Sequence, residues 1–212
     1  MISHHGGKMR LPSGRNKSDF KVLRVKKNRF SIIGLTGLIL ALCLPAACAQ
    51  REDLQPPTGL AGTLIVLNKS GHDASFIDLA SGELLATLPT GRGPHEIIVT
   101  DDGRWAIGTD YSGGNSLTVF DVENLIVHKT IDMSDYPYPH GILFLPGQEE
   151  VIVTSEISGK LVIVNFHEGK ISRTIDTNQN GSHMVAVSAD GSVAYTSNGD
   201  SNSVSVIDIP NG

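Results

Sequence analysis

The pentapeptide Val204–Asp208 (VSVID) decides the fold, because three similar stretches precede it in the chain. These stretches are Ala74–Asp78 (ASFID), Leu117–Asp121 (LTVFD) and Leu161–Asn165 (LVIVN). The last residues of the four stretches are 43, 44 and 43 positions apart in sequence. The chain is therefore expected to be built from repeats.

A second series of residues has the same period. His95, His140 and His183 each stand before an apolar run, at separations of 45 and 43 residues. Two independent series with one period predict a structural repeat. A repeat of this length that holds about four short strands is typical of the blades of a β-propeller, so the sequence predicts an all-β fold.

Turn residues place the strands within each repeat. The first strand opens at the histidine and ends at a turn such as Asp190-Gly191, because glycine accepts positive φ and favours a hairpin. A second strand is expected at residues 193–197, and a third ends at Asp208. The fourth, outer strand follows a turn of the form Asp-x-x-x-Gly, as between Asp78 and Gly82.

The second repeat departs from this outer turn. Leu125 stands where the glycine is expected. Asparagine adopts the left-handed conformation more readily than leucine, so we expect Asn124 to take over the role of the glycine.

The last repeat resembles a known family. Tyr195–Asn198 (YTSN) followed by Asn202–Asp208 (NSVSVID) is similar to the YVTN β-propeller repeat, and the resemblance extends over about residues 63–212. It implies an exported, bacterial type of propeller with seven blades of four antiparallel strands. A resemblance of this kind is specific for fold and leaves function open, because propellers carry many chemistries.

The number of expected strands is half of what that family implies. Residues 63–212 are expected to hold about three and a half blades of the seven. We therefore expect a truncated propeller that folds poorly on its own, because repeat units gain stability by stacking on their neighbours.

The N-terminal segment, residues 1–49, is interpreted as an extension with a secretory signal peptide. The apolar run Ile32–Leu44 follows Lys26, Lys27 and Arg29, and Ala47-x-Ala49 follows the run, which is the layout of a cleaved signal. Export to the periplasm or the medium is the expectation. Two alternatives stay open, a lipid anchor at Cys48 and an uncleaved membrane anchor. Residues 50–62 are polar and rich in Pro and Gly, and they are interpreted as a linker to the propeller at 63–212.

Charge and cysteine content exclude several classes of function. Residues 50–212 carry 21 Asp and Glu against eight Lys and Arg, a net charge of -13, which repels nucleic-acid phosphates. Both cysteines, Cys43 and Cys48, lie in the signal segment. The mature chain therefore has no disulfide framework, no thiol nucleophile and no cysteine-ligated metal.

The repeated histidines are the candidate functional residues. Each opens the innermost strand of its blade, so all three are expected to face the mouth of the central channel on one side. Such a face can bind a divalent metal, for example Cu or Zn, or an anionic ligand. The alternative is that each histidine only bonds neighbouring backbone. The ligand-binding set predicted from the sequence is His95, Glu96, Tyr138, His140, Glu156 and His183, with His95, His140 and His183 as metal ligands.

These residues favour a non-enzymatic, exported propeller that binds a small ligand or a partner protein at the channel mouth. The alternative is a propeller enzyme that uses the same face, either a metal-dependent oxidoreductase or a lactonase-like hydrolase. The sequence lacks Gly-x-Ser-x-Gly, His-Glu-x-x-His, a phosphate loop and a dinucleotide fingerprint, so no common catalytic motif supports the enzyme.

The signal interpretation predicts cleavage between Ala49 and Gln50. N-terminal sequencing of the exported protein is expected to begin at Gln50, because small residues stand at the two positions that signal peptidases read. A membrane-bound protein with lipid on Cys48 would contradict cleavage at this bond.

Overall fold

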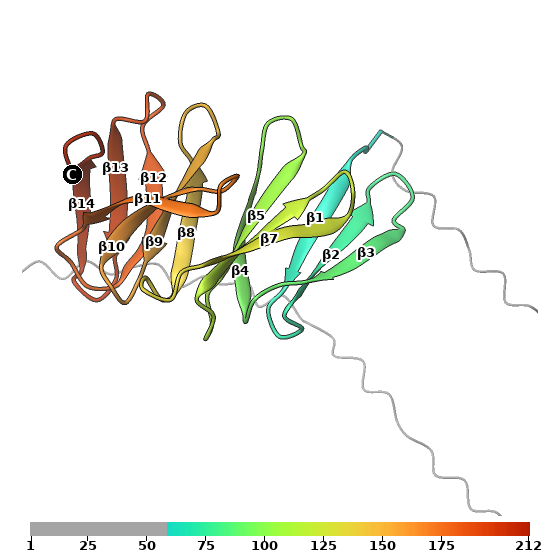
Figure 1. Cartoon of the computed structure of the whole chain (residues 1–212), viewed down its shortest axis with the longest axis horizontal. Helices are drawn as coiled ribbons and strands as arrows, with labels where there is room; N and C mark the ends of the chain where they lie inside the picture. Colours follow the sequence, from blue (N-terminus) through green and yellow to red (C-terminus); the bar gives the residue numbers. More distant parts are fainter. Residues whose placement is uncertain (1–58) are drawn as a thin grey trace, which may run out of the picture. The chain divides into compact units, whose positions relative to one another are not determined.

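The computed structural model describes residues 59–212, so the signal segment, Cys48 and most of the linker lie outside the described residues. Fourteen β-strands form four antiparallel sheets (Figure 1). We call these sheets blades 1 to 4, in chain order. The all-β fold and the four-stranded blade predicted from the sequence are confirmed. Among these residues no helix is long and apolar enough to cross a membrane.

The strands follow one another across each blade in sequence order. Blade 1 has three strands, β1 (Thr63–Asn68), β2 (Asp73–Asp78) and β3 (Leu84–Pro89). Blade 2 has β4 (Pro94–Val99), β5 (Trp105–Asp110), β6 (Ser116–Asp121) and β7 (Ile126–Asp132). Blade 3 has β8 (Pro139–Phe144), β9 (Glu150–Ser155), β10 (Lys160–Asn165) and β11 (Lys170–Asp176). Blade 4 has β12 (Ser182–Val187), β13 (Val193–Asn198) and β14 (Ser203–Asp208).

The blades pack face to face, with one apolar cluster between each pair. Strand β9 shows the pattern: Val151 and Val153 face blade 2, and Ile152 faces blade 4. Because both faces of blade 3 are covered, its central strands are continuous apolar runs rather than alternating ones. Between blades 1 and 2 the core is small, and Phe76 packs edge-on against Phe120 with ring centres 5.4 Å apart.

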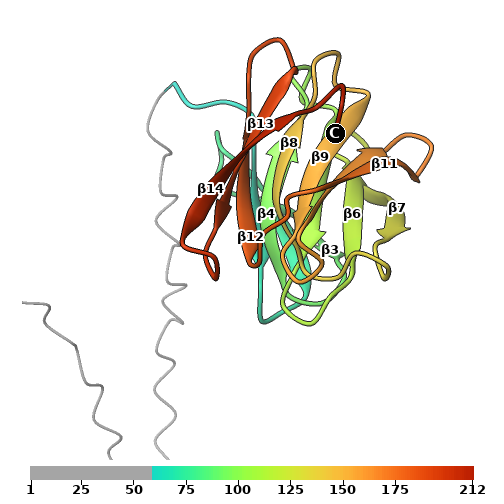
Figure 2. The same ribbon diagram turned by 90° about the vertical axis from the view of Figure 1, so that its left-hand side faces the viewer.

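The two outermost sheet faces are not covered by another described blade. Figure 2 looks onto blade 4, where Val204 and Val206 are 65% and 68% exposed. On blade 1, Leu64 and Val66 are likewise exposed. These strands keep the alternating pattern of a sheet that is buried on one side only.

The turns before the outer strands form as the sequence predicts, with one correction. The carboxylate or amide oxygen of Asp78, Asp121, Asn165 and Asp208 accepts the N–H of the third residue after it in each case. In blade 2 the expectation that Asn124 takes the left-handed conformation is wrong. Leu125 itself has φ of 52°, because the turn fixes the position at which positive φ is needed, whichever residue stands there.

A polar network recurs at the ends of β1, β5 and β13, which occupy the same place in blades 1, 2 and 4. Asn198 shows it complete: Nδ2 donates to Ser203 and Ser205, and Oδ1 accepts from the hydroxyls of Ser182 and Thr196. The residues at the same place in blades 1 and 2 are Asn68 and Asp110.

Asp110 leaves this network incomplete. Its Oδ2 accepts from Ser116 at 2.6 Å and from Thr118 at 2.9 Å, but its buried Oδ1 has no partner. Pro94 and Gly108, which carry no hydroxyl, stand where blade 4 has Ser182 and Thr196. Burial of the carboxyl raises the pKa of Asp110, although the two hydroxyl donors oppose the shift.

The incomplete network predicts that Asp110→Asn stabilises the protein. Asn removes a buried, half-partnered carboxylate and matches the residues found at this place in blades 1 and 4. We expect the free energy of unfolding to rise by about 1–3 kcal/mol, measured by urea denaturation. The reverse change at the equivalent position of blade 4, Asn198→Asp, is expected to lower the free energy of unfolding. If Asp110→Asn and Asn198→Asp both changed the free energy of unfolding by the same amount in the same direction, this account would be contradicted.

Candidate functional site

Each repeated histidine lies in a β-bulge. The pairing of the first and second strands shifts register between Pro94 and Ile97, between Pro139 and Ile142, and between Ser182 and Met184. A bulge turns the side chain at this point away from the regular alternation of the strand. Local strand geometry therefore positions His95, His140 and His183 in one equivalent way.

A hydroxyl on the second strand satisfies the backbone at each bulge. Behind His140, the N–H of Gly141 donates to Thr154 Oγ1 at 2.9 Å. The other two bulges use Thr109, which accepts from Glu96 N–H at 3.2 Å, and Ser197, which accepts from Met184 N–H at 3.3 Å. The bulge is thus built into each repeat by side chains that the histidine series does not reveal.

The three histidines converge, as their register predicts. The ring centres of His95 and His140 are 4.5 Å apart, and those of His140 and His183 are 3.6 Å apart. They come from β4, β8 and β12, the first strands of blades 2, 3 and 4, and β8 contacts both of the others. We call this group the histidine cluster.

Gly141 allows the short distance between His140 and His183. A Cβ atom on Gly141 would lie 2.9 Å from Met184 Cα and 2.9 Å from Val185 N, closer than real contacts allow. Only a residue without a side chain lets β8 and β12 approach this closely.

Each outer histidine faces a carboxylate. His95 Nδ1 lies 3.3 Å from Glu96 Oε1, and His183 Nδ1 lies 3.5 Å from Glu156 Oε2. Glu156 Oε2 is buried and makes no hydrogen bond. Both glutamates proposed from the sequence therefore stand at the cluster, one on either side of His140.

His140 occupies the centre of the cluster and is 2% exposed. Its Nδ1 is buried and has no hydrogen-bond partner. Burial, together with the neighbouring His183 and His95, lowers the pKa of His140 to about 4, although Glu96 and Glu156 oppose the shift. The ring is therefore neutral at physiological pH, with lone-pair electrons available to a ligand.

Tyr138 is held in a backbone conformation that tyrosine rarely adopts. Its φ is 56°. In the loops before β4 and β12, the equivalent residues are Gly93, with φ of 64°, and Gly181, with φ of 66°. A bulky residue with positive φ costs free energy, and such residues gather at functional sites. Tyr138 packs edge-on against Tyr111, with ring centres 5.5 Å apart.

Tyr111 belongs to the site, although the sequence interpretation did not include it. Its ring centre lies 4.6 Å from that of His140 and 5.4 Å from that of His95. Hydrogen bonding to the Glu156 carboxylate, followed by partial burial, raises the pKa of Tyr111 to about 12. Tyr111 follows β5 as Glu156 follows β9, so the register that identified Glu156 also pointed to Tyr111.

A hollow of about 540 Å³ opens beside the cluster. Its lining residues are Tyr111, Tyr138, Glu156, Ile157, Asn180, Gly181 and Asp200. Two aromatic rings and two carboxylates thus line the hollow, and none of these residues is basic. Such a lining suits a ligand with apolar surface and positive charge.

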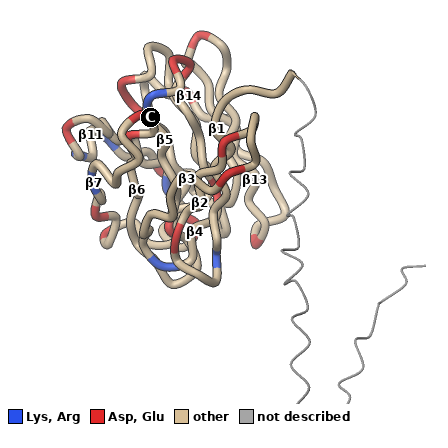
Figure 3. Tube along the Cα trace, turned by 90° about the vertical axis from the view of Figure 1, so that its right-hand side faces the viewer, with Lys and Arg blue, Asp and Glu red and all other residues tan. Residues whose placement is uncertain are grey.

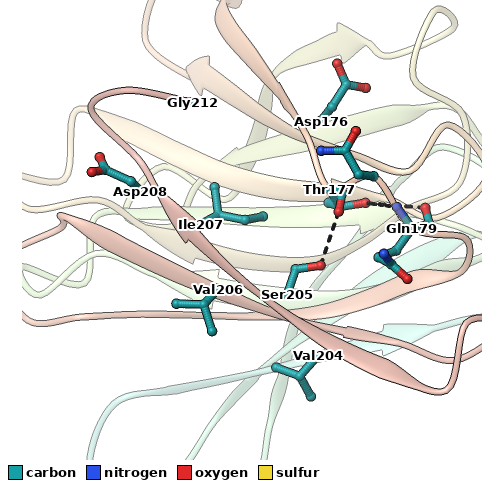
Figure 4. Close-up of a pocket in the computed structure, with 10 residues that line it drawn as sticks. Asp176, Thr177, Gln179, Val204, Ser205, Val206, Ile207, Asp208 and Gly212 are labelled. Carbon is teal, nitrogen blue, oxygen red and sulfur yellow. Dashed lines mark hydrogen bonds between the residues drawn. The ribbon is translucent and has the colours of Figure 1, made fainter.

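Figure 4 shows a different hollow, of about 370 Å³, between β14 and the loop after β11. Its polar groups bond one another; Ser205 Oγ, for example, donates to the carbonyl of Thr177 at 3.2 Å. No residue of the candidate site lines it, so we do not consider it part of the site.

The other histidines of the described residues, His72, His128 and His167, lie apart from the cluster. His128 and His167 flank Trp105, with ring centres 4.8 Å and 5.6 Å from that of the indole. His72 accepts the N–H of Gly93 at 3.0 Å and so fixes the loop before β4.

The charge of the described residues is mainly acidic. Figure 3 shows Asp and Glu spread over the loops of the blades, with few Lys and Arg. This excess surrounds the site with negative potential, which favours cations over anions. The anionic ligand considered from the sequence is therefore the less favoured alternative.

Comparison with known proteins supports the fold alone. No protein-family model matches the chain, and no curated protein matches it. A solved structure described as Kuenenia stuttgartiensis hydrazine synthase is similar, with a TM-score of 0.63 and 24% sequence identity. The similarity covers 70% of this chain and 43% of that one, so the chain spans less than half the length of its neighbour. The propeller-like fold is supported, and membership of the YVTN family stays a prediction.

The buried position of His140 predicts that its ring does not titrate between about pH 5.5 and 8. In the unfolded chain the same ring takes up a proton near pH 6.5. The unfolded state then binds more protons, so stability is complete above about pH 6.5 and falls as the pH is lowered toward 4. NMR titration of the His140 ring in native protein and in urea checks both states. A native midpoint near 6.5 would contradict the burial argument.

Proposed function

We propose that this protein is an exported, non-enzymatic propeller module that binds a small, positively charged ligand in the hollow beside the histidine cluster. The observation that carries the proposal is the lining of that hollow by Tyr111, Tyr138, Glu156 and Asp200. Export rests on the sequence of residues 1–49, and the enzymatic alternatives stay predictions from the sequence.

The aromatic rings supply the first element of recognition. A tyrosine face attracts a cation through its negative quadrupole, most strongly where water is partly excluded. Lys69 already uses the ring of Tyr111 in this way, with Nζ 5.6 Å from the ring centre. Tyr138 adds a second ring to the lining, at an interplanar angle of 88° to the ring of Tyr111.

The carboxylates supply the second element. Glu156 Oε2 is buried without a hydrogen bond, and a buried carboxylate oxygen in this state gains free energy from a cationic partner. Asp200, in the loop between β13 and β14 of blade 4, adds a second carboxylate to the lining. Charge and aromatic surface thus favour the same class of ligand, an amine or a quaternary ammonium group.

The strained backbone at Tyr138 agrees with a binding role. Glycine would relieve the positive φ, and the other two loops have glycine at this place. Tyrosine at this position therefore costs conformational free energy that glycine would not, and in return it places an aromatic ring in the lining of the hollow.

Binding of tetramethylammonium to chelator-treated protein tests the proposal. We expect saturable shifts of the NMR signals of Tyr111, Tyr138 and Gly181, and no such shifts with tert-butanol, a neutral molecule of similar size. Tyr138→Gly removes the ring and relieves the backbone, so weaker binding cannot be attributed to misfolding. It is expected to weaken binding at least ~3-fold, as is Glu156→Gln.

Two matched variants control this experiment. Tyr195→Leu removes an exposed tyrosine on β13, outside the lining, and Glu96→Gln removes a carboxylate on the other side of the cluster. Both are expected to leave tetramethylammonium binding unchanged. Equal binding of the cation and the alcohol, or unchanged binding by Tyr138→Gly, would overturn the proposal.

A further inference from the structure

The geometry points to a divalent transition-metal site made by His95, Glu96 and His140, with zinc as the best-matched ion. One donor atom from each residue lies within 4.8 Å of the other two. The three residues come from β4 and β8, so two blades contribute to the site. The site lies next to the proposed ligand hollow but does not depend on it, because the two share none of these residues.

The distances between the donor atoms suit a small metal ion once the side chains move slightly. Ligand atoms on a tetrahedral zinc ion with bonds of ~2.0 Å are about 3.3 Å apart. His95 Nδ1 and Glu96 Oε1 are already 3.3 Å apart. His95 is an exposed residue and Glu96 a half-buried one, so both side chains can adjust toward His140. The third ligand is the fixed one, because burial holds the ring of His140 in place.

His140 supplies an independent sign of a missing partner. Its Nδ1 is buried without a hydrogen bond, in a side chain that is 2% exposed. A buried polar atom in this state is unusual, since nearly all such atoms find a partner in folded proteins. A metal ion shared with the adjacent His95 and Glu96 gives the ring a partner that no described protein group provides.

His183 is left out of the proposed site, which in this respect differs from the ligand set expected from the sequence. Its Nδ1 lies 3.5 Å from Glu156 Oε2, and its ring lies against that of His140 with centres 3.6 Å apart and planes tilted by 30°. A stacked ring directs its nitrogens along its own edge and not toward a metal held by its neighbour. Glu96 is the third metal ligand in this proposal, where the sequence register had predicted His183.

The donor set selects the kind of ion. Two imidazoles and one carboxylate suit zinc, copper and similar ions, whereas calcium and magnesium prefer oxygen ligands alone. Three protein ligands leave one tetrahedral position for water or for a bound ligand, the pattern of open rather than structural zinc sites. His95 is an exposed residue, so water or a ligand can reach the site from solvent.

Metal titration of the full chain tests the inference. After chelator treatment and dialysis, we expect one Zn²⁺ per chain by elemental analysis and competition with a chromophoric chelator. Replacement by Co²⁺ is expected to give the visible absorption of a tetrahedral site with nitrogen and oxygen ligands. Glu96→Gln keeps the shape of the side chain and is expected to weaken Zn²⁺ binding at least ~10-fold, as is His95→Gln.

The other side of the cluster provides matched controls. Glu156→Gln and His183→Gln make the same chemical changes at residues outside the proposed ligand set, so zinc affinity is expected to stay within about 2-fold of the parent value. Zinc loss in His183→Gln equal to that in His95→Gln would overturn the assignment, as would unchanged binding in Glu96→Gln. Absence of stoichiometric zinc in the parent chain would remove the site altogether.

The paired variants also separate this inference from the proposed function. Glu96→Gln is expected to lose zinc and keep tetramethylammonium, and Glu156→Gln is expected to do the reverse. Loss of only one of the two activities in the parent protein therefore identifies which proposal has failed.

Discussion

The packing of one blade against the next is the constraint on which the rest of the structure depends. A single blade cannot bury its own faces, so the apolar side chains of β9 and β10 point alternately toward blade 2 and blade 4. This packing brings the first strands of the blades closest together, and β8 contacts both β4 and β12. Gly141 permits the tightest of these approaches.

The site follows from this packing together with a bulge that each repeat carries. Thr109, Thr154 and Ser197 accept hydrogen bonds from the displaced backbone N–H groups, and the bulges direct one histidine from each of blades 2, 3 and 4 toward the same place. Differences between the repeats then give the two proposed sites their different side chains. Blade 2 adds Glu96 and Tyr111, and blade 3 adds Glu156, with Tyr138 in the loop before it.

The two carboxylates divide the cluster into two sites with different chemistry. On one side Glu96 and His95 lie beside His140, whose Nδ1 is unpartnered, and donor atoms suited to a small metal ion are close together. On the other side His183 and Glu156 border a wider hollow with aromatic walls. Because His140 is buried and neutral, it adds no positive charge that would repel a cation from either side.

Register in the sequence predicted much of this arrangement and missed particular parts of it. Equal spacing was enough to predict that His95, His140 and His183 converge, because equivalent residues of equivalent blades lie at equivalent positions. The position of Glu156 in the loop after a second strand placed it on the same face as the histidines, without saying which histidine it would meet. The sequence interpretation omitted Tyr111, although this residue has the register of Glu156, because a tyrosine after a strand carries no motif of its own.

The sequence by itself determined the all-β fold, the period of the blades, the turns and the strands that carry the candidate residues. These properties are local, since alternation, turn residues and repeat length act within one blade. Only the tertiary structure decided that Leu125 takes positive φ, that Oδ1 of Asp110 is left without a donor and that His140 is buried between its neighbours. It also placed His183 with Glu156 and His95 with Glu96. The reason is physical: these facts depend on the conformation of particular turns, on side-chain packing within a blade and on distances between blades, and spacing along a chain contains none of these.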